Sequence, residues 1–434
     1  MKKKLFLFLF LLSAIGLNAQ TAKEEIFADV HRSASMYYAY PDSRETELTP
    51  ASSGYAPFYI STYQRHGSRF LTNPHDYAGT LAILRQADAA GKLTPLGKKT
   101  MTDVDSLTRM SQGRIGELSP LGAKQLSGIG QRMVHNFPEV FTGNARVDAR
   151  STIVIRCILS MMNECLQFKA FNPVIDIRSD ASEHDMYYMN YDDEEIAQLR
   201  ELPEIKAVLE KFRREHTHPE RLMASLFNDR DYVKQHIDSD RLMRTLFSLA
   251  GNMQSHKGQT SIHLYPLFTK EECYDLWQIQ NLEWYNHFGS SPLTKGQMPY
   301  IEANLLDNIL NTADTCITRQ RNGATVRFGH DTCVMPLAAL MELGDCSKIV
   351  HDPDSLADAC RNYKIVMMAS NIQLIFYRSS KDKDKDILVK ALLNEQEVSL
   401  PVKTDLAPYY HWKDVEAYYR NKLLKFRNQR QLRG

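Results

Sequence analysis

Two arginines and a histidine lie together near the start of the chain, in the segment Arg65-His66-Gly67-Ser68-Arg69. The planar guanidinium group of arginine presents N–H donors in a fork that matches the oxygens of a phosphate group. Positive charge beside an imidazole opposes its protonation, so we expect His66 to be neutral and able to attack phosphorus. Gly67 allows backbone and ligand to approach closely. Taken alone, the segment is more typical of a basic surface turn.

A second segment, Gly329-His330-Asp331, supplies a group that an attacking histidine needs. A carboxyl group beside the reacting phosphorus can donate a proton to the departing oxygen. The alternative for this segment is an ordinary helix N-cap next to a packed histidine. Arg156 can provide a further phosphate contact, or it can form a partly buried salt bridge. Together, the three segments indicate a site for phosphate chemistry.

Predicted strands precede these segments along the chain. Residues 58–63 and 325–328 are aromatic and β-branched runs that end just before the two histidines. Arg156 falls in a strand region predicted over 146–158, with a helix following from Ser160. Ligands of open α/β sheets bind beyond the carboxyl ends of the strands, so we expect the three segments to meet at one edge of a sheet.

The remaining segments of the chain alternate between helix-like and strand-like patterns. We predict helices over 77–90, 122–137 and 336–343, and strands over 172–178, 363–368, 372–377 and 387–393. Alternating strands and helices favour an α/β layer fold, and the closely spaced final strands add antiparallel pairing. The predicted fold class is therefore α/β, with a mixed central sheet flanked by helices.

Residues 181–300 differ from the rest of the chain because few β-rich runs interrupt them. The apolar spacing predicts helices over 194–214, 219–227, 239–250 and 270–288. We expect this segment to form a helical cap, inserted into an α/β core made of residues 20–180 and 301–434.

The first nineteen residues have the pattern of a secretory signal. Lys2 to Lys4 form a basic start, residues 5–12 are an unbroken apolar run, and Ala19 is a small residue at the expected cleavage point. The apolar run is too short to span the ~30 Å of bilayer hydrocarbon. We therefore expect an exported protein that is periplasmic, cell-surface associated or secreted, with no integral membrane segment after the signal is removed.

The composition excludes several classes of protein. Charged residues make up 24% and hydrophobic residues 43% of the 434 residues, which excludes wholesale disorder and a coiled coil. Lys and Arg number 53 against 52 Asp and Glu, and this balance argues against a nucleic-acid partner. No C-x-x-C pair occurs, which disfavours zinc ribbons and thioredoxin-like sites. The sequence leaves two alternatives for its seven cysteines, which can be buried free thiols or can form one or two disulfides. They are Cys157, Cys165, Cys273, Cys316, Cys333, Cys346 and Cys360.

The order and spacing of the motifs resemble the histidine phosphatase superfamily, in the branch of histidine acid phosphatases and phytases. That family carries Arg-His-Gly-x-Arg near its N-terminus and His-Asp or His-Ala-Glu late in the chain, like residues 65–69 and His330-Asp331 here. Residues 118–122 are similar to the family's helix entry, and Arg156 is similar to its third phosphate-binding arginine. The resemblance extends from about residue 55 to the C-terminus.

The resemblance implies a phosphomonoester hydrolase that works through a phosphohistidine. It implies that His66 is the nucleophile and that Asp331 is the proton donor. It further implies that the phosphate oxygens are bound by Arg65, Arg69, Arg156 and His330. No metal and no cofactor are implied, because the arginines supply the positive charge. The implied partner is a small phosphorylated substrate.

Within the family, exported bacterial multiple inositol-polyphosphate phosphatases are most similar in length and layout, which makes inositol polyphosphates such as phytate the expected substrates. Those enzymes typically carry His-Ala-Glu, whereas this chain has His330-Asp331-Thr332, the form of the other phytases and acid phosphatases. A substrate crowded with phosphate groups needs cations beyond those of the motifs. Candidates for these additional contacts are Arg85, Lys98, Lys99, Arg213 and Arg214, although each is also compatible with an ordinary surface charge.

Four alternatives stay open at this point. The first is a general acid phosphatase acting on sugar phosphates or other small monoesters. The second is a phosphoglycerate-mutase-like transferase, against which the export signal and the large helical insertion argue. The third is a metallophosphatase with His330, Asp331, His351 and Asp352 as ligands, although no tight ligand motif supports it. The fourth is a non-catalytic surface protein that binds phosphate or glycans.

Overall fold

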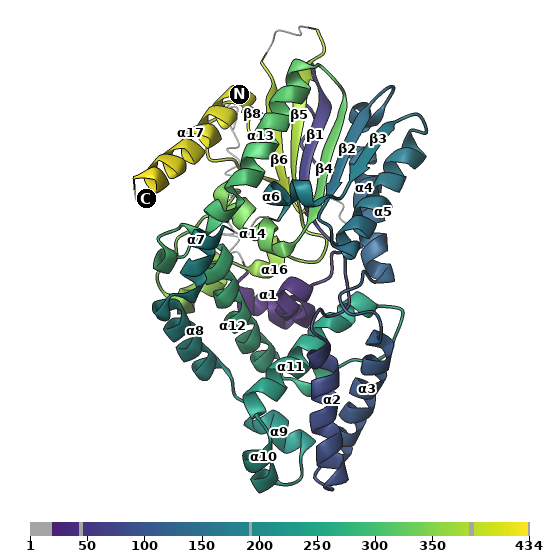
Figure 1. Ribbon diagram of the computed structural model, residues 1–434, viewed down its shortest axis with the longest axis vertical. Coiled ribbons are helices and arrows are strands. Elements are labelled where there is room, and N and C mark those ends of the chain that lie inside the picture. Colours follow the sequence, from purple (N-terminus) through teal and green to yellow (C-terminus); the bar gives the residue numbers. More distant parts are fainter. Residues whose placement is uncertain (1–19, 43–46, 191–192, 382–385, 433–434) are drawn as a thin grey trace, which may run out of the picture.

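The computed structural model describes residues 20–42, 47–190, 193–381 and 386–432. The proposed signal peptide therefore lies outside the described residues, as does most of the charged run that follows Lys381. Figure 1 shows an elongated molecule with a β-sheet at one end and a group of helices at the other. Among the described residues, no helix is long and apolar enough to cross a membrane.

The central sheet is mixed, as predicted. Its strands follow the order β3-β2-β4-β1-β5-β6-β7, and β8 pairs with β6. The parallel part consists of β3 (Asp176–Asp180), β2 (Arg146–Ser151), β4 (Gly323–Gly329) and β1 (Tyr55–Arg65). The antiparallel part, which continues from β1, consists of β5 (Asn371–Ser379), β6 (Leu388–Leu393), β7 (Gln396–Val398) and β8 (Tyr410–His411).

Helices cover both faces of the sheet, so the central strands are buried almost throughout. Successive side chains of a strand point to opposite faces, and the neighbours Tyr59 and Ile60 accordingly belong to different apolar clusters. One face packs against α4 (Pro120–Asn136) and α5 (Ile155–Phe171). The other face packs against α13 (Ala303–Thr318), α14 (Asp331–Leu340) and α17 (Trp412–Gln431).

The helical end of the molecule draws on two stretches of sequence. Figure 1 places there α2 (Pro74–Ala89), α3 (Pro95–Ser111), α8 (Pro203–His216), α9 (Glu220–Leu226), α10 (Arg230–His236), α11 (Ser239–Asn252) and α12 (Lys270–Phe288). The start of α3 is tied to α9, because the backbone N–H of Thr94 donates to the carbonyl of Leu226 over 2.9 Å. The division into a core and a cap of residues 181–300 stays a prediction, and residues 74–111 lie with that helical group.

Shorter helices connect these elements. They are α1 (Ala22–Ala28), α6 (Met186–Met189), α7 (Glu194–Ala197), α15 (Leu356–Ala359) and α16 (Asn362–Ile365). The 3₁₀ segment Val30–Tyr37 crosses from the N-terminus towards the carboxyl end of the sheet, where its Met36 carbonyl accepts from Arg65. All seven cysteines are free thiols, and five of them are buried.

Two predicted strand regions are wrong. The region predicted over 146–158 is a strand only to Ser151, and α5 begins at Ile155, so Arg156 lies in the first turn of a helix and not at a strand end. The region predicted over 363–368 begins with helix α16 instead. In both cases the β-branched or apolar composition suggested a strand, and tertiary contacts decided otherwise. At α16 the side chain of Asn362 accepts from Trp277 Nε1 over 2.9 Å and fixes the turn.

Helix boundaries differ in two places from the prediction. α14 begins at Asp331, five residues before the predicted start, and carries Pro336 in its interior. The prediction placed Pro336 at the start of the helix, because proline lacks the backbone N–H that donates a hydrogen bond at an interior position. The segment predicted as one helix over 194–214 is two helices, since Pro203 begins the second.

Candidate active site

Three strands of the parallel part of the sheet end level with one another. In the register of the sheet, Arg65 of β1 lies beside Gly329 of β4, and Ser151 of β2 lies beside Phe328. The residues that follow these strand ends are therefore neighbours in space. The structure brings together all six residues proposed from the sequence, at the edge of the sheet that faces the helical end.

His66 is fully buried just beyond β1. Its Nδ1 lies 2.9 Å from the carbonyl oxygen of Gly67. A carbonyl oxygen only accepts, so Nδ1 carries the proton and Nε2 keeps a free lone pair. Burial, together with the charges of Arg65, Arg69 and Arg156, holds the pKa of His66 well below its ordinary value. The ring is therefore neutral and nucleophilic at Nε2.

The motif loop after β1 is braced by the first turn of α4. A Cβ atom on Gly67 would lie 2.4 Å from the carbonyl oxygen of Gly122, so both positions need glycine for this approach. The N–H of Ser119 donates to the carbonyl of Ser68 over 2.8 Å, and the N–H of Ser68 donates to Gln125 Oε1 over 2.9 Å. The segment that resembled a family helix entry thus holds the loop in shape.

Arg65 is the most enclosed charge of the site. Its side chain has no solvent exposure, and its Nη1 donates to the carbonyl oxygens of Met36 and Val366 over 2.5 and 2.6 Å. Its Nη2 lies 2.6 Å from Asp331 Oδ2. Burial lowers the pKa of Arg65 to about 10, although Asp331 opposes this, so the group stays charged at neutral pH.

Arg69 and Arg156 bring two further guanidinium groups to the site. Arg69 is buried, donates through Nη1 to the carbonyl of Phe70 over 2.9 Å, and lies 5.5 Å above the ring of Tyr37. Arg156 is half-buried at the start of α5. Neither has a carboxylate partner within the described ranges of the chain.

The Nε–H groups of the three arginines are available to an anionic ligand. In Arg65, Arg69 and Arg156, Nε is buried and has no hydrogen-bond partner among the residues that the structure describes. Buried N–H donors in folded proteins are nearly always paired, and leaving one unpaired costs about 1–3 kcal/mol. Three such donors beside one neutral histidine are best explained by an oxyanion that completes the site.

His330 and Asp331 follow β4. The rings of His330 and His66 lie edge to face with centroids 5.7 Å apart, and His330 Nε2 lies 3.4 Å from Thr152 Oγ1. Burial and the charge of Arg156 lower the pKa of His330 to about 4, so it is neutral above mildly acidic pH. Burial raises the pKa of Asp331, but the charges of Arg65 and Arg69 outweigh it and hold that pKa below its ordinary value.

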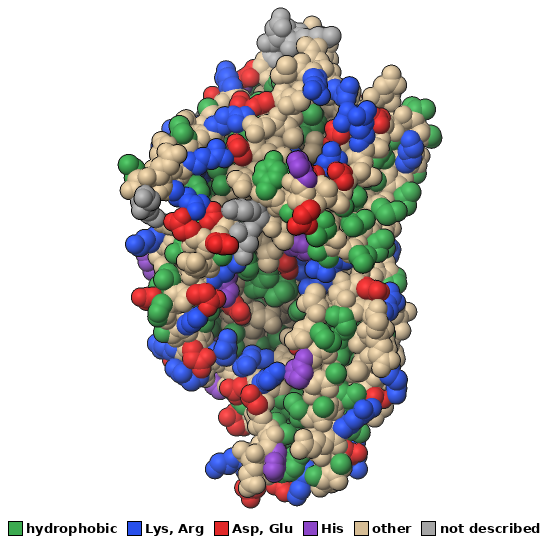
Figure 2. Space-filling view, viewed as in Figure 1, with side chains coloured by type: hydrophobic (Ala, Val, Ile, Leu, Met, Phe, Trp, Pro, Cys, Tyr) green, Lys and Arg blue, Asp and Glu red, His purple; other side chains and the backbone are tan. Residues whose placement is uncertain are grey.

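The charge of the resting site suits a phosphate group. Three guanidinium groups carry positive charge, Asp331 is ionised, and both histidines are neutral. The excess of two positive charges attracts an anionic phosphate group. Figure 2 shows the surface hollowed between the sheet and the helical end, with Lys or Arg and His side chains at the edge of the hollow.

The ligand set considered for a metallophosphatase does not form in this structure. His351 and Asp352 line a small cavity beside Leu282 and Pro292, and His330 is not among the residues that line it. Within the described ranges, no group of three or more His, Cys, Asp or Glu side chains is arranged to hold a metal ion.

The additional cations proposed for a crowded polyphosphate are surface charges. Arg85, Lys98 and Lys99 lie near aspartates of the α2–α3 hairpin, at 2.7, 3.8 and 2.5 Å from Asp105, Asp88 and Asp103. Arg213 and Arg214 lie 3.2 and 3.5 Å from Glu210 on the same helix. Each therefore already has an acidic partner on the surface.

Two residues at the site escaped the sequence interpretation. Tyr37 lies against Arg69, and Thr152 lies against His330. Neither belongs to a motif with chemical meaning of its own, and closeness in sequence to Arg156 was the only signal for Thr152. Ser160, named above as the predicted start of the helix after Arg156, also lies at the site, where its Oγ accepts from the N–H of Gly67 over 3.2 Å.

Comparisons with known proteins find relatives that match most of this chain. The family model described as "Histidine phosphatase superfamily (branch 2)" matches residues 61–394. Multiple inositol polyphosphate phosphatase 1 of Gallus gallus is 21% identical over 397 residues, which cover 84% of this chain and 82% of that protein.

Solved structures show the same fold. The multiple inositol polyphosphate phosphatase of Bifidobacterium longum in complex with inositol hexasulfate superposes with a TM-score of 0.73 at 18% identity, covering 89% of this chain and 97% of that one. The phytase of D. castellii superposes with a TM-score of 0.66 at 14% identity, covering 91% and 85%. The family match spans most of the chain and contains the whole site from Arg65 to Asp331, and the chain thus belongs to branch 2 of the histidine phosphatase superfamily.

Proposed function

We propose that this protein removes phosphate groups from inositol polyphosphates such as phytate, through a phosphohistidine formed on His66. The observation that carries the proposal is the neutral His66, whose free Nε2 lies among three arginines with unbonded Nε–H groups. The relatives that support the substrate class are the inositol polyphosphate phosphatases and the phytase, which match over most of both chains.

In the first step, His66 Nε2 attacks phosphorus in line with the departing oxygen. The N–P bond forms as the P–O bond breaks, and the electron pair of that bond leaves with the alkoxide. The charge on the three non-bridging oxygens is neutralised by Arg65, Arg69 and Arg156, and His330 donates a further hydrogen bond. Asp331 gives its proton to the alkoxide, which leaves as the inositol hydroxyl.

In the second step, water hydrolyses the phosphohistidine. The Asp331 carboxylate now accepts a proton from the attacking water, a P–O bond forms, and the electron pair of the N–P bond returns to His66 Nε2. Inorganic phosphate then leaves the arginines. Both steps use only side chains of this chain.

The proton on Asp331 must come with the substrate. In the free site, Arg65 holds this carboxyl in its ionised form. A phosphate monoanion brings one proton, and its oxygens compete for Arg65, so the pair Asp331–phosphate shares that proton in the bound state. We therefore expect activity on alkyl phosphates to be highest at acidic pH.

We also propose that the protein is exported, on the pattern of residues 1–19. Periplasmic, cell-surface and secreted locations are all compatible with that pattern. A general acid phosphatase is the second candidate function, favoured by the His330-Asp331-Thr332 form of the motif.

The test is phosphate release from phytate and from glucose 6-phosphate, with a chelator present throughout. We expect turnover of phytate to equal or exceed that of the sugar phosphate and to survive the chelator. Acid-quench experiments with ³²P-labelled substrate should trap label on the wild-type chain and none on His66→Ala. Preference for the sugar phosphate would favour the general acid phosphatase. Activity lost with the chelator and restored by a divalent ion would refute the mechanism.

A further inference from the structure

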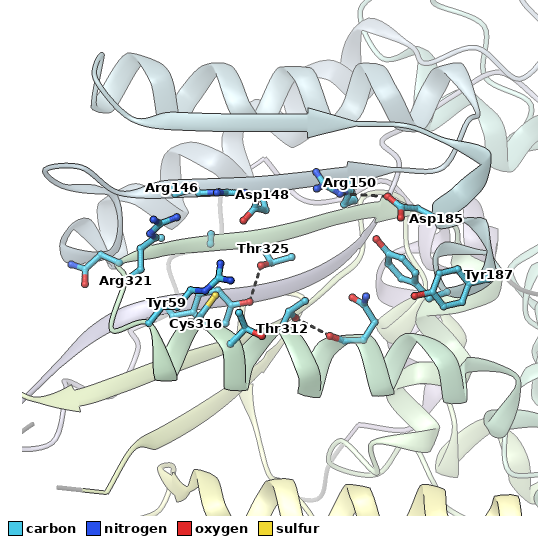
Figure 3. A pocket seen from close by; sticks show the side chains of 17 residues that line it. Tyr59, Arg146, Asp148, Arg150, Asp185, Tyr187, Thr312, Cys316, Arg321 and Thr325 are labelled. Atoms are coloured by element: carbon cyan, nitrogen blue, oxygen red, sulfur yellow. Dashed lines mark hydrogen bonds and ion pairs between the residues drawn. The ribbon is translucent and has the colours of Figure 1, made fainter. Parts of the chain in front are cut away.

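A second cavity, here called the sheet-face groove, lies on the face of the sheet covered by α13. Its volume is about 350 Å³, and its charged lining consists of Arg146, Arg150, Arg319, Arg321, Asp148 and Asp185. Figure 3 shows Arg146, Asp148 and Arg150 along β2, Asp185 beside Arg150 at one end of the groove, and Arg321 at the other end. The active site lies beyond the carboxyl ends of the same strands, so the proposed catalytic steps leave this groove unused.

Both aspartates of the groove already form ion pairs with arginines that line it. Arg146 Nη2 lies 2.6 Å from Asp148 Oδ1, and Arg150 Nε lies 3.4 Å from Asp185 Oδ2. Arg319 and Arg321 are exposed at the end of α13, and neither has a carboxylate partner in the part of the chain that the structure describes. The lining therefore carries an excess of two positive charges.

The buried Arg327, whose partners Asn308 and Thr312 line the groove, adds a further positive charge to this excess. Arg327 has no solvent exposure, and it donates to neutral groups: Asn308 Oδ1 over 2.8 and 3.0 Å, Thr312 Oγ1 over 2.8 Å and Ser61 Oγ over 3.0 Å. Asn308 and Thr312 both line the groove. A buried charge without a counter-charge is costly, and an anion in the groove would offset that cost.

We propose that the sheet-face groove binds a small polyanion that carries phosphate groups, independently of the active site. Guanidinium forks suit phosphate oxygens. The ring of Tyr187, which is 53% exposed, adds aromatic surface for the carbon skeleton. The volume lies within the ~300–1,000 Å³ typical of small-molecule sites.

The test is a calorimetric titration of the full chain with inositol hexakissulfate, whose sulfate esters stand in for phosphate. We expect two binding events. Arg319→Ala combined with Arg321→Ala should weaken one event by roughly tenfold to a hundredfold, as expected for lost charge-assisted hydrogen bonds. Arg156→Ala should weaken the other event, which reports on the active site and on the proposed function. The control, Lys403→Ala with Lys425→Ala, removes the same charge from exposed positions and should preserve both events.

A single event in the wild type would overturn the proposal, and so would a groove variant that keeps both events unchanged. Equal weakening in the lysine control would show a general charge effect and would also overturn it. A competition titration distinguishes the source of the phosphate group. Displacement by inorganic phosphate would support a site for the reaction product, whereas displacement only by the organic polyanion would support a site for substrate.

A separate observation concerns the outer face of α5. Its apolar residues Ile155, Leu159, Met162 and Leu166 are 69, 40, 52 and 60% exposed. Their spacing of four, three and four residues is that of the seam between two packed helices. Ile153 and Val174, in the turns before and after α5, are 50 and 72% exposed, and together with the seam they are called the α5 face below.

We infer that a second copy of this chain packs on the α5 face. Six apolar residues that are each exposed by 40% or more lie on this one helix and the turns that flank it, and such a grouping is typical of a protein–protein interface. A two-fold axis would place the four-residue seam against itself, with Leu159 and Met162 near the axis. A lipid surface fits less well, because helices that lie on membranes carry several Lys and Arg beside the apolar stripe, whereas Lys169 is the single cation of α5 apart from Arg156 of the active site.

The test is the mass of the full chain in solution, measured by light scattering after size-exclusion chromatography. We expect a dimer for the wild type and a monomer for Met162→Glu combined with Leu166→Glu. The control is Leu424→Glu, which places the same charge at a leucine of α17 that is 55% exposed, and it should stay dimeric. A monomeric wild type would overturn the inference, as would a Met162→Glu/Leu166→Glu dimer. A monomer that sediments with phosphatidylglycerol vesicles would assign the α5 face to lipid instead.

Discussion

Replacing Asp331 by asparagine separates proton donation from the other tasks of the site. The amide keeps the shape of the carboxyl group, and its oxygen can still lie beside Arg65 Nη2, which is 2.6 Å from Asp331 Oδ2. His66 and the three arginines are unchanged. Only the proton donor is lost, and with it one negative charge.

The size of the effect should depend on the leaving group. Loss of a general acid costs about 10²–10⁴ in rate, or about 3–5 kcal/mol of transition-state stabilisation. An inositol alkoxide is a poor leaving group and should bear this whole cost. A nitrophenolate leaves without a proton, so p-nitrophenyl phosphate should lose less than about tenfold. Because Asp331→Asn removes a negative charge beside Arg65, product phosphate should also inhibit the variant more strongly.

The assay compares kcat/KM for phytate and for p-nitrophenyl phosphate in the wild type and in Asp331→Asn. Asp345→Asn is the matched control, because Asp345 is an exposed aspartate that pairs with Lys348 over 3.0 Å. The control should leave both substrates unaffected. Equal losses on the two substrates in Asp331→Asn would show that Asp331 positions the site or binds substrate, and would refute its assignment as the acid.

Three further changes probe other features of the site and its support. His66→Ala should abolish turnover of phytate and of p-nitrophenyl phosphate alike, and measurable aryl activity would contradict the phosphohistidine. Gly67→Ala places a Cβ 2.4 Å from the Gly122 carbonyl oxygen, so both kcat/KM and the melting temperature should fall, and an unchanged melting temperature would contradict the close packing. Burial raises the pKa of Glu164 to about 8, against about 4.3 in the unfolded chain, so wild-type stability should fall as pH rises between these values. Glu164→Gln, which keeps the bond from Gln64 Nε2, should therefore melt higher than the wild type at pH 8 and similarly at pH 4, and parallel melting curves across pH would refute this.

The sequence was sufficient to predict the strands whose carboxyl ends carry the site residues. β1 and β4 are buried on both faces, so their aromatic and β-branched runs are continuous and easily recognised. Parallel strands also fix where their carboxyl ends lie, which is why His66 and His330 were expected to meet.

The local setting of Arg156 was not predictable in the same way. The run from Thr152 to Ile155 has the composition of a strand, yet it crosses into α5, and Ile153 and Ile155 are 50 and 69% exposed. Apolar residues that face outwards cannot be distinguished by composition from residues of a buried strand. If a second copy covers the α5 face, this failure has a physical cause, because the residues were selected for an interface that one chain does not show.

The contacts that fix Arg65 illustrate a further limit of the sequence. Its Nη1 is held by the backbone carbonyls of Met36 and Val366, which lie 29 and 301 residues away in the chain. A carbonyl oxygen is present at every position, so no residue type marks these partners. The motif therefore identifies the charge, whereas the surrounding fold determines its direction. Rigid backbone acceptors orient the guanidinium group through Nη1, and Nη2 forms an ion pair with Asp331, so the same contacts that bury this arginine also fix the position of its charge beside His66.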